Sequence, residues 1–284
     1  MEKFSVAAVS TRNWIADPER SIENLANWAR KAAAQGARFV VFPELSVSGY
    51  FHSQRVWDAA EPIPGPSVER MIGVARTAGA VLCFGLLERD ADIVYNTQVI
   101  VDGDGVLGAQ RKIHMPGTEY LHWRGGFEAH VIDIGAARVG VAICYDALYS
   151  EWARTLFLKG AEVLVMPFAC NPGPVSRGRF PDEHIHAMTY RSHCYCNGAY
   201  GIVANLAGST AGAGDGGSDV RFPGWAGVFG PRGEVVAWAR DEGNDEAMVV
   251  AELDPEQTAA ARRDMYFLPR CLRPDAYASL DPRS

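Results

Sequence analysis

The chain has 284 residues, of which 48% are hydrophobic and 21% are charged. This composition is typical of a globular protein and far from that of a disordered chain. The 27 basic and 34 acidic residues give a net charge of −7, which excludes the strongly basic surface that nucleic-acid-binding proteins use. The six cysteines are too sparse for a disulfide scaffold. We therefore expect a small-molecule substrate and no nucleic-acid partner.

The beginning of the chain and the length of its apolar runs indicate the cellular compartment of the protein. Met1–Phe4 leads directly into a strand-like segment, without the charged, apolar and small-residue regions of a secretory signal. No apolar run approaches membrane-spanning length. The sequence therefore predicts a cytoplasmic protein without a membrane partner.

Short β-rich runs alternate with amphipathic segments along the chain. Phe4–Ser10 is predicted as a strand, and Asp17-Pro18 then begins a helix as N-cap and first-turn proline, with Gly36 after its end. Further strands are predicted at 38–43, 80–86, 95–101, 106–112, 138–144, 162–168, 201–205, 225–230, 234–239 and 246–253. Further helices are predicted at 150–160 and 183–196, and another follows the proline-rich loop 62–66 and continues to about Ala78.

The connections between these elements predict the fold class. Asp102-Gly103-Asp104-Gly105 is a strong hairpin turn, whereas other strands are joined through helices. Hairpins and helical crossovers together indicate an α/β protein with mixed sheets and outer helices. The glycine-rich segment 208–218 is interpreted as a surface loop, and no repeat or linker divides the chain. We expect residues 1–284 to form a single domain.

Three reactive side chains lie where predicted strands end. Glu44 follows Phe39–Pro43, Lys112 ends one strand, and Cys144 ends another. Taken singly, each has an ordinary explanation: a buried thiol, or a charge where the core meets water. Taken together, they indicate a site, because strand ends gather functional groups at one edge of an α/β sheet.

The three segments resemble the nitrilase superfamily of carbon–nitrogen hydrolases. The resemblance rests on Phe42-Pro43-Glu44-Leu45, on Arg111-Lys112-Ile113-His114 and on Ile143-Cys144-Tyr145-Asp146, in this order and approximate spacing. It extends from the first strand to Arg273–Tyr277, so it covers essentially the whole chain. The resemblance implies a four-layer α-β-β-α sandwich, a homodimer or higher homo-oligomer, and a carbon–nitrogen hydrolase domain that needs no cofactor.

The resemblance also implies a role for each residue. Cys144 is expected to attack the substrate and form a thioester, with Glu44 as general base. Lys112 and a backbone N–H such as that of Tyr145 are expected to stabilise the oxyanion. Glu119 corresponds to a second glutamate of the family, and it would hold Lys112 in place or bind the substrate nitrogen.

The preferred reaction is hydrolysis of a small amide, which releases ammonia. Hydrolysis of an N-carbamoyl amine or amino acid is the second candidate, and nitrile hydrolysis is the third. The carbamoyl-amino-acid branch needs an arginine soon after the cysteine, but none occurs before Arg154. A non-catalytic binding protein on the same scaffold, and a thiol-redox role for Cys194 and Cys196, are the alternatives from other classes.

Several aromatic and polar residues lie close to the proposed strand ends. Those expected to bind substrate are Tyr50, Tyr120, Trp123, Tyr145, Phe168 and Asn171. No metal site is expected, because His184 and His186 are two positions apart on a predicted helix and face different sides. Gly212–Gly217 lacks the Gly-Lys-Ser/Thr of a phosphate-binding loop.

Overall fold

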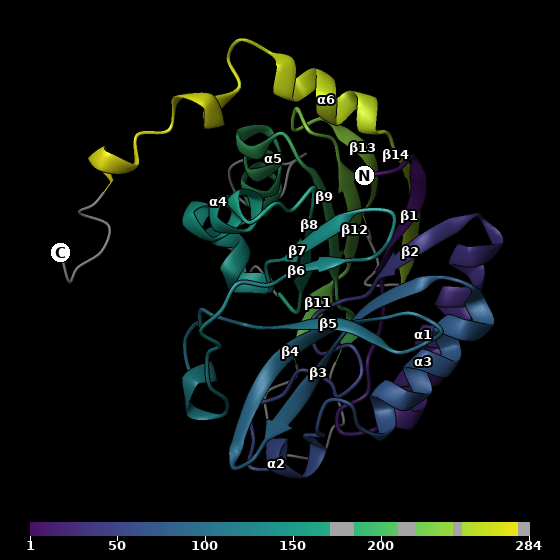
Figure 1. Ribbon diagram of the computed structural model, residues 1–284. Helices are drawn as coiled ribbons and strands as arrows, with labels where there is room; N and C mark the ends of the chain where they lie inside the picture. Colours follow the sequence, from purple (N-terminus) through teal and green to yellow (C-terminus); the bar gives the residue numbers. More distant parts are fainter. Residues whose placement is uncertain (171–184, 210–219, 241–245, 278–284) are drawn as a thin grey trace.

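Two six-stranded sheets lie face to face in this protein (Figure 1). The structure, a computed structural model, describes residues 1–170, 185–209, 220–240 and 246–277. In order across the first sheet, the strands are β14 (Ala247–Leu253), β1 (Phe4–Ser10), β2 (Ala37–Val41), β3 (Val81–Asp90), β4 (Ile93–Val101) and β5 (Val106–Arg111). Across the second sheet they are β13 (Val235–Arg240), β12 (Trp225–Phe229), β9 (Tyr200–Asn205), β8 (Val163–Phe168), β7 (Arg138–Val141) and β6 (Val131–Asp133). A separate pair joins β10 (Ala207–Ser209) to β11 (Arg221–Pro223).

Helices cover the outer face of each sheet, so the expected four-layer α-β-β-α sandwich is confirmed (Figure 1). The first sheet is covered by α1 (Pro18–Ala34) and α3 (Pro66–Ala78), and the second by α4 (Ser150–Leu158) and α5 (Ile185–Asn197). The short or peripheral helices are α2 (Val56–Ala59), α6 (Pro255–Arg263), η1 (Glu119–Leu121), η2 (Cys144–Leu148), η4 (Leu268–Cys271) and η5 (Pro274–Ala276). None of the helices among the described residues is long and apolar enough to span a bilayer.

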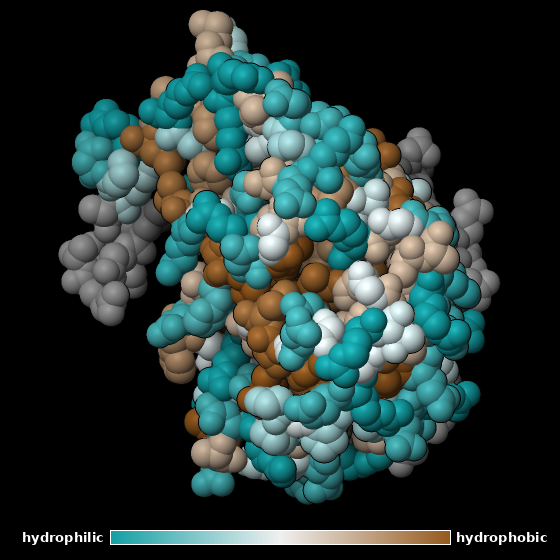
Figure 2. All heavy atoms as spheres, turned by 45° about the vertical axis from the view of Figure 1, so that its right-hand side comes forward, coloured by the Kyte–Doolittle hydropathy of each residue, from teal (hydrophilic) through white to brown (hydrophobic). Residues whose placement is uncertain are grey.

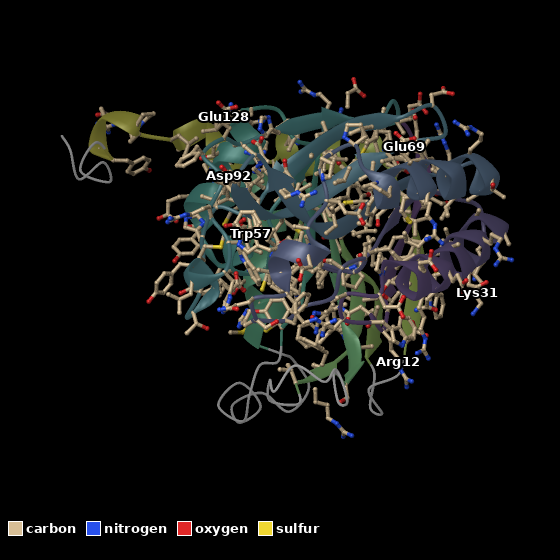
Figure 3. All side chains as sticks on the ribbon, turned by 90° about the horizontal axis from the view of Figure 1, so that it is seen from below. Arg12, Lys31, Trp57, Glu69, Asp92 and Glu128 are labelled. Atoms are coloured by element: carbon tan, nitrogen blue, oxygen red, sulfur yellow. The ribbon has the colours of Figure 1, made fainter. Side chains whose placement is uncertain are left out.

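Helix α1 begins and ends where its sequence predicts. The Asp17 side chain accepts a hydrogen bond from the Arg20 N–H at 3.1 Å, which satisfies one of the free donors of the first turn. Gly36, after the helix, has φ +84°, a conformation that glycine adopts without a steric penalty. In Figure 3 the labelled Lys31 lies on the outer side of α1, facing away from the sheets.

The strands are apolar on both faces because each sheet is buried on both faces. On β1, Val6 and Ala8 pack in the core between the two sheets, whereas Ala7 and Val9 pack against the helices. Full burial of one such valine stabilises the fold by about 1.5–3 kcal/mol. This packing explains why the strands appear in the sequence as near-continuous hydrophobic runs instead of alternating patterns.

Strand directions bring the ends of several strands to one edge of the sandwich. Strands β2 and β3 are parallel, and two antiparallel pairings then make β5 run in the direction of β2. Strands β7, β8 and β9 are parallel to one another. A parallel bridge between Thr11 and Leu206, directly after β1 and β9, joins the two sheets at this edge. The carboxyl ends of β2, β5, β7 and β8 therefore lie at the same edge.

Several predicted boundaries differ from the observed ones. The strand predicted at 138–144 ends at Val141, because Cys144 has φ +49° and lies outside the extended region. Gly208 and Ser209, predicted as loop, belong to β10, and 210–219 lie outside the described residues. Helix α6 was not predicted, although Asp254-Pro255 begins it with the same N-cap and proline signal that begins α1.

The outer surface of the molecule is mostly hydrophilic on the face that Figure 2 presents. Figure 2 shows hydrophilic residues over most of the face it presents, with hydrophobic residues gathered near the centre. Residues 264–277, which follow α6, extend away from the two sheets (Figure 1). Met265 and Tyr266 in this segment are 78% and 74% exposed.

Candidate active site

Glu44 lies three residues after β2 and is fully buried. Its Oε1 accepts hydrogen bonds from Lys112 Nζ at 2.8 Å and from Asn96 Nδ2 at 2.7 Å. Its Oε2 accepts one from the backbone N–H of Ala169 at 2.7 Å. Because Ala169 directly follows β8, this last bond connects the second sheet to a carboxylate carried by the first.

The turn that carries Glu44 depends on a close backbone approach. Leu45 has φ +47°, which is unusual for a residue with a side chain. The facing residue on β3 is Gly85, and a Cβ at that position would lie 2.3 Å from the Leu45 nitrogen. The absence of a side chain at Gly85 therefore lets the Glu44 turn pack directly against β3.

Lys112 directly follows β5, and its ammonium group is buried between two carboxylates. Besides its contact with Glu44, Nζ lies 3.0 and 2.8 Å from Oε1 and Oε2 of Glu119. Burial lowers the pKa of Lys112, but the negative charges of Glu44 and Glu119 oppose that effect, and the pKa lies above its ordinary value. Lys112 therefore provides a permanent positive charge inside the protein.

Glu119 lies in η1 and accepts hydrogen bonds from three side chains. Lys112 contacts both of its oxygens, Tyr50 Oη donates to Oε1 at 2.8 Å, and Trp123 Nε1 donates to Oε2 at 3.3 Å. Burial raises the pKa of Glu119, while Lys112 opposes that rise. Burial also raises the pKa of Tyr50, so its hydroxyl remains a donor to Glu119. These contacts fix Glu119 in place with its oxygens occupied.

Cys144 begins η2 just beyond β7, at a point where the chain turns sharply. A non-glycine residue with positive φ costs about 1–3 kcal/mol, and such residues concentrate at functional sites. Burial and the charge of Glu44 raise the pKa of the Cys144 thiol well above its ordinary value, and Lys112 opposes them only in part. The resting thiol is therefore protonated at neutral pH and needs a base to become a nucleophile.

The side chains expected to bind substrate occupy different surroundings. Tyr50 and Trp123 lie next to Glu119, and Tyr145, which is half-buried, follows Cys144 in η2. Tyr120 is 62% exposed, whereas Phe168 is buried and packs against the Tyr190 ring at 4.9 Å. Asn171 lies outside the described residues. Contact of these residues with substrate stays a prediction.

Three contributors to the site were not predicted from the sequence. They are Asn96, the backbone N–H of Ala169, and Asp146, which binds the segment after Lys112. Asn96 has a visible signal, because Asn96-Thr97-Gln98 is a polar run inside an apolar strand and all three residues are buried. A backbone donor such as that of Ala169 leaves no signal in a sequence.

Comparisons with known proteins identify the family of the chain and relatives with the same fold. The family model described as carbon-nitrogen hydrolase matches residues 5–263. A nitrilase of Pyrococcus abyssi is 33% identical over 259 residues, which cover 88% of this chain and 89% of the relative. An N-carbamoylputrescine amidase of Solanum lycopersicum is 30% identical, with 93% and 90% covered. The crystal structure of a carbon-nitrogen hydrolase from Helicobacter pylori superposes with a TM-score of 0.87 at 25% identity, covering 98% of each chain.

Replacing Gly85 by alanine tests the close approach beneath Glu44. We expect Gly85→Ala to lower the free energy of unfolding by about 1–3 kcal/mol, because its Cβ overlaps the Leu45 nitrogen. Gly73→Ala is the matched control: its Cβ meets no atom within 4 Å, so alanine there should stabilise α3 by about 0.5–1 kcal/mol. Urea unfolding measures both, and equal stability of the two variants would contradict the packing argument.

The protonated state of Cys144 can be tested by alkylation. An ordinary thiol has a pKa of about 8.5, so its reaction with iodoacetamide levels off above that pH. Because the pKa of Cys144 is raised, we expect its alkylation rate to keep rising beyond pH 9. Mass spectrometry of the Cys144 peptide measures the rate, with the exposed Cys271 as an internal check on reagent access. A plateau below pH 8.5 would show that the thiolate forms without a base.

Proposed function

The chain belongs to the carbon–nitrogen hydrolase family, and from that premise we propose that it hydrolyses a small primary amide to the acid and ammonia. It is a hydrolase of non-peptide carbon–nitrogen bonds. The observation that carries the proposal is the buried ion pair between Glu44 and Lys112, at the edge of the sandwich where β7 leads into Cys144. A base, a cation and a thiol at one edge are what amide cleavage through a thioester requires.

In the proposed acylation step, the Cys144 sulfur attacks the amide carbon while Glu44 takes the thiol proton. The carbonyl oxygen becomes an oxyanion, which the Lys112 ammonium and the Tyr145 N–H stabilise. The first N–H groups of a helix lack partners within it, so the start of η2 suits this role. Collapse of the intermediate breaks the C–N bond, and Glu44 returns the proton to the departing ammonia.

Deacylation repeats these roles with water as the nucleophile. Water attacks the thioester carbon while Glu44 takes its proton, and the same two donors stabilise the second oxyanion. The C–S bond then breaks, and the thiolate of Cys144 recovers the proton from Glu44. The products are the carboxylic acid and the original enzyme.

The contacts of Glu119 favour a role in holding Lys112 in place over a role in binding the substrate nitrogen. Its two oxygens are occupied by Lys112, Tyr50 and Trp123. A new donor from substrate would have to displace one of them. We propose that Glu119 keeps the Lys112 ammonium directed at the oxyanion, and that Tyr50 and Trp123 keep Glu119 in place.

A second candidate substrate is an N-carbamoyl amine, which would release ammonia in the acylation step and leave a thiocarbamate on Cys144. Water would then hydrolyse the thiocarbamate to a carbamic acid, which breaks down to the amine and carbon dioxide. With a protonated thiol, Glu44, Glu119 and Lys112 sum to one negative charge, which favours a neutral or cationic substrate over a carboxylate. Arg154 is not directed at this charge, since it donates to the Cys196 carbonyl at 2.8 Å. Four relatives at 30–32% identity are named N-carbamoylputrescine amidase, and putrescine is an amine. Nitrile hydrolysis is the third candidate.

We further propose that the protein acts in the cytoplasm as a homodimer. The C-terminal segment supports dimerisation, because it reaches away from the sheets (Figure 1) with exposed apolar side chains. Among these are Met265, Tyr266 and Leu268. Such side chains are more commonly buried against a partner than left in water.

Ammonia release tests the proposed reaction. The purified protein is incubated with primary amides, N-carbamoyl amines, N-carbamoyl amino acids and aliphatic nitriles, and ammonia is measured over time. We expect release from amides or N-carbamoyl amines, and a fall of about 10⁴-fold or more in Cys144→Ala, because the nucleophile is lost.

Two further results sharpen that assay. Cys144→Ala should keep its secondary structure by circular dichroism, since the loss of one sulfur at a half-buried position leaves the core intact. Release that persists in Cys144→Ala would refute the mechanism. Preference for N-carbamoyl amino acids over N-carbamoyl amines would refute the charge argument.

Light scattering after size-exclusion chromatography tests the dimer. The chain has a mass of 30.9 kDa, so we expect about twice that mass for the full-length protein. Replacing Met265 and Tyr266 by serine should shift the protein towards the monomer, because it removes two exposed apolar side chains from the proposed interface. A monomer at all concentrations of the wild type would contradict the proposal.

A further inference from the structure

We propose that Asp146 is a positioning residue, which fixes Lys112 relative to Cys144 by binding the chain directly after Lys112. This inference rests on the proposed roles of Lys112 and Cys144. It adds a residue that does not touch the substrate but determines whether cation and nucleophile act together.

The need for such a residue follows from the topology. Lys112 is carried by β5 of the first sheet, and Cys144 follows β7 of the second, so no ladder of backbone hydrogen bonds links them. Side chains that cross from one sheet to the other therefore help to set their separation, in addition to the backbone bridge between Thr11 and Leu206 at this edge. At this site, Glu44 of the first sheet accepts a hydrogen bond from the backbone N–H of Ala169 in the second. Asp146 of the second sheet accepts hydrogen bonds from residues 113 and 114 of the first.

The Asp146 carboxylate is fully buried and receives three N–H donors from these two residues. It accepts from the Ile113 N–H at 3.2–3.3 Å, from the His114 N–H at 2.7 Å, and from the His114 ring Nδ1 at 2.7 Å. These backbone donors lie just beyond the end of β5, where pairing with β4 stops. Asp146 thus replaces the missing strand partner for the chain that leaves Lys112.

On its other side, Asp146 is part of the turn that begins with Cys144. Its own N–H donates to the Ile143 carbonyl at 2.9 Å, and its carbonyl accepts from the Tyr149 N–H at 3.1 Å. The turn starts from the strained φ of +49° at Cys144. One residue therefore holds both the turn of the nucleophile and the chain that follows the cation.

The His114 ring adds a second contact between the same two segments. In this arrangement Nδ1 carries the hydrogen that is donated to Asp146, which sets the tautomer. The ring stacks on Tyr149, with centroids 3.9 Å apart and an angle of 11° between the planes. Residues 113–114 are thus held to η2 and the residue after it by hydrogen bonds and by ring stacking.

Asp146→Asn tests the proposal, because it removes the negative charge from a carboxylate that accepts three N–H donors, which weakens its hydrogen bonds. It also leaves one acceptor oxygen in place of two and puts an NH₂ group where Oδ2 accepts from the Ile113 N–H. A displacement of about 1 Å at a reacting group can lower a rate about 100-fold. We expect kcat/KM for ammonia release to fall about 10- to 100-fold through kcat, with KM changed less than threefold. A residue that only stabilised the fold would not separate kcat from KM in this way.

The alkylation rate of Cys144 gives a second readout that requires no substrate. The titratable groups that face this thiol include Glu44, Lys112, Cys170 and Glu119, with the hydroxyls of Tyr50 and Tyr190. Burial raises the pKa of the thiol most, and Lys112 lowers it. If Lys112 moves away in Asp146→Asn, the thiolate becomes scarcer, and alkylation between pH 7 and 9 should slow about three- to tenfold. This readout remains valid even if the proposed substrates are wrong.

Glu162→Gln is the matched control for the loss of a carboxylate. Glu162 accepts from the N-terminal ammonium at 2.7 Å and from the Arg138 N–H at 3.0 Å, just before β8 and at the opposite edge from Cys144. The Glu162→Gln substitution should lower the melting temperature of the protein without changing the alkylation rate of Cys144 or kcat. An equal fall of kcat in this control, at an equal loss of stability, would overturn the proposal.

His114→Phe covers the case in which Asp146→Asn does not fold. The phenyl ring keeps the stacking on Tyr149 but removes one of the three donors to Asp146, so we expect a three- to tenfold fall in kcat and slower alkylation of Cys144. If the folded variants keep kcat/KM and the alkylation rate within twofold of the wild type, Asp146 has no positioning role.

Discussion

The contact between Lys112 and the carboxylates of Glu44 and Glu119 is the constraint to which the rest of the site conforms. All three groups are at most 1% exposed, and taking each charge out of water costs several kcal/mol unless partners compensate for it. The compensation comes from Asn96 in β4, from the N–H of Ala169 directly after β8, and from the loop residues Tyr50 and Trp123. The two sheets must pack in one arrangement for these donors to meet the charges.

Burial and the same charges explain why the nucleophile needs a base. Burial raises the pKa of the Cys144 thiol most, the charge of Glu44 raises it further, and the Lys112 ammonium opposes them only in part. A thiol kept neutral is protected from unwanted alkylation and oxidation, and in the proposed mechanism it becomes nucleophilic only when Glu44 removes its proton. In the same proposal Lys112 stabilises the charge that moves from the sulfur to the carbonyl oxygen, which is where a preorganised cation is most effective.

Backbone strain is placed beside both the base and the nucleophile. Leu45, next to Glu44, and Cys144 itself have positive φ values of 47° and 49°. Each deviates from the extended strand that precedes it, and this turns the functional side chain out of the sheet and into the site. The cost is tolerated because neighbouring contacts hold each turn, Gly85 beneath the first and Asp146 within the second.

The sequence by itself determined the layered α/β fold and the candidate reactive residues, because both leave local signals. Buried strands are near-continuous apolar runs, caps such as Asp17-Pro18 mark helix starts, and Glu44, Lys112 and Cys144 follow apolar strands within motifs of the family. Only the tertiary structure decided which groups surround them. Asn96, the Ala169 N–H and Asp146 act across strands or between sheets, and nothing in their own neighbourhoods along the chain indicates which distant charge or backbone donor they meet. The physical reason is that a hydrogen bond between residues far apart in sequence depends on the packing of the two sheets, which no local pattern encodes.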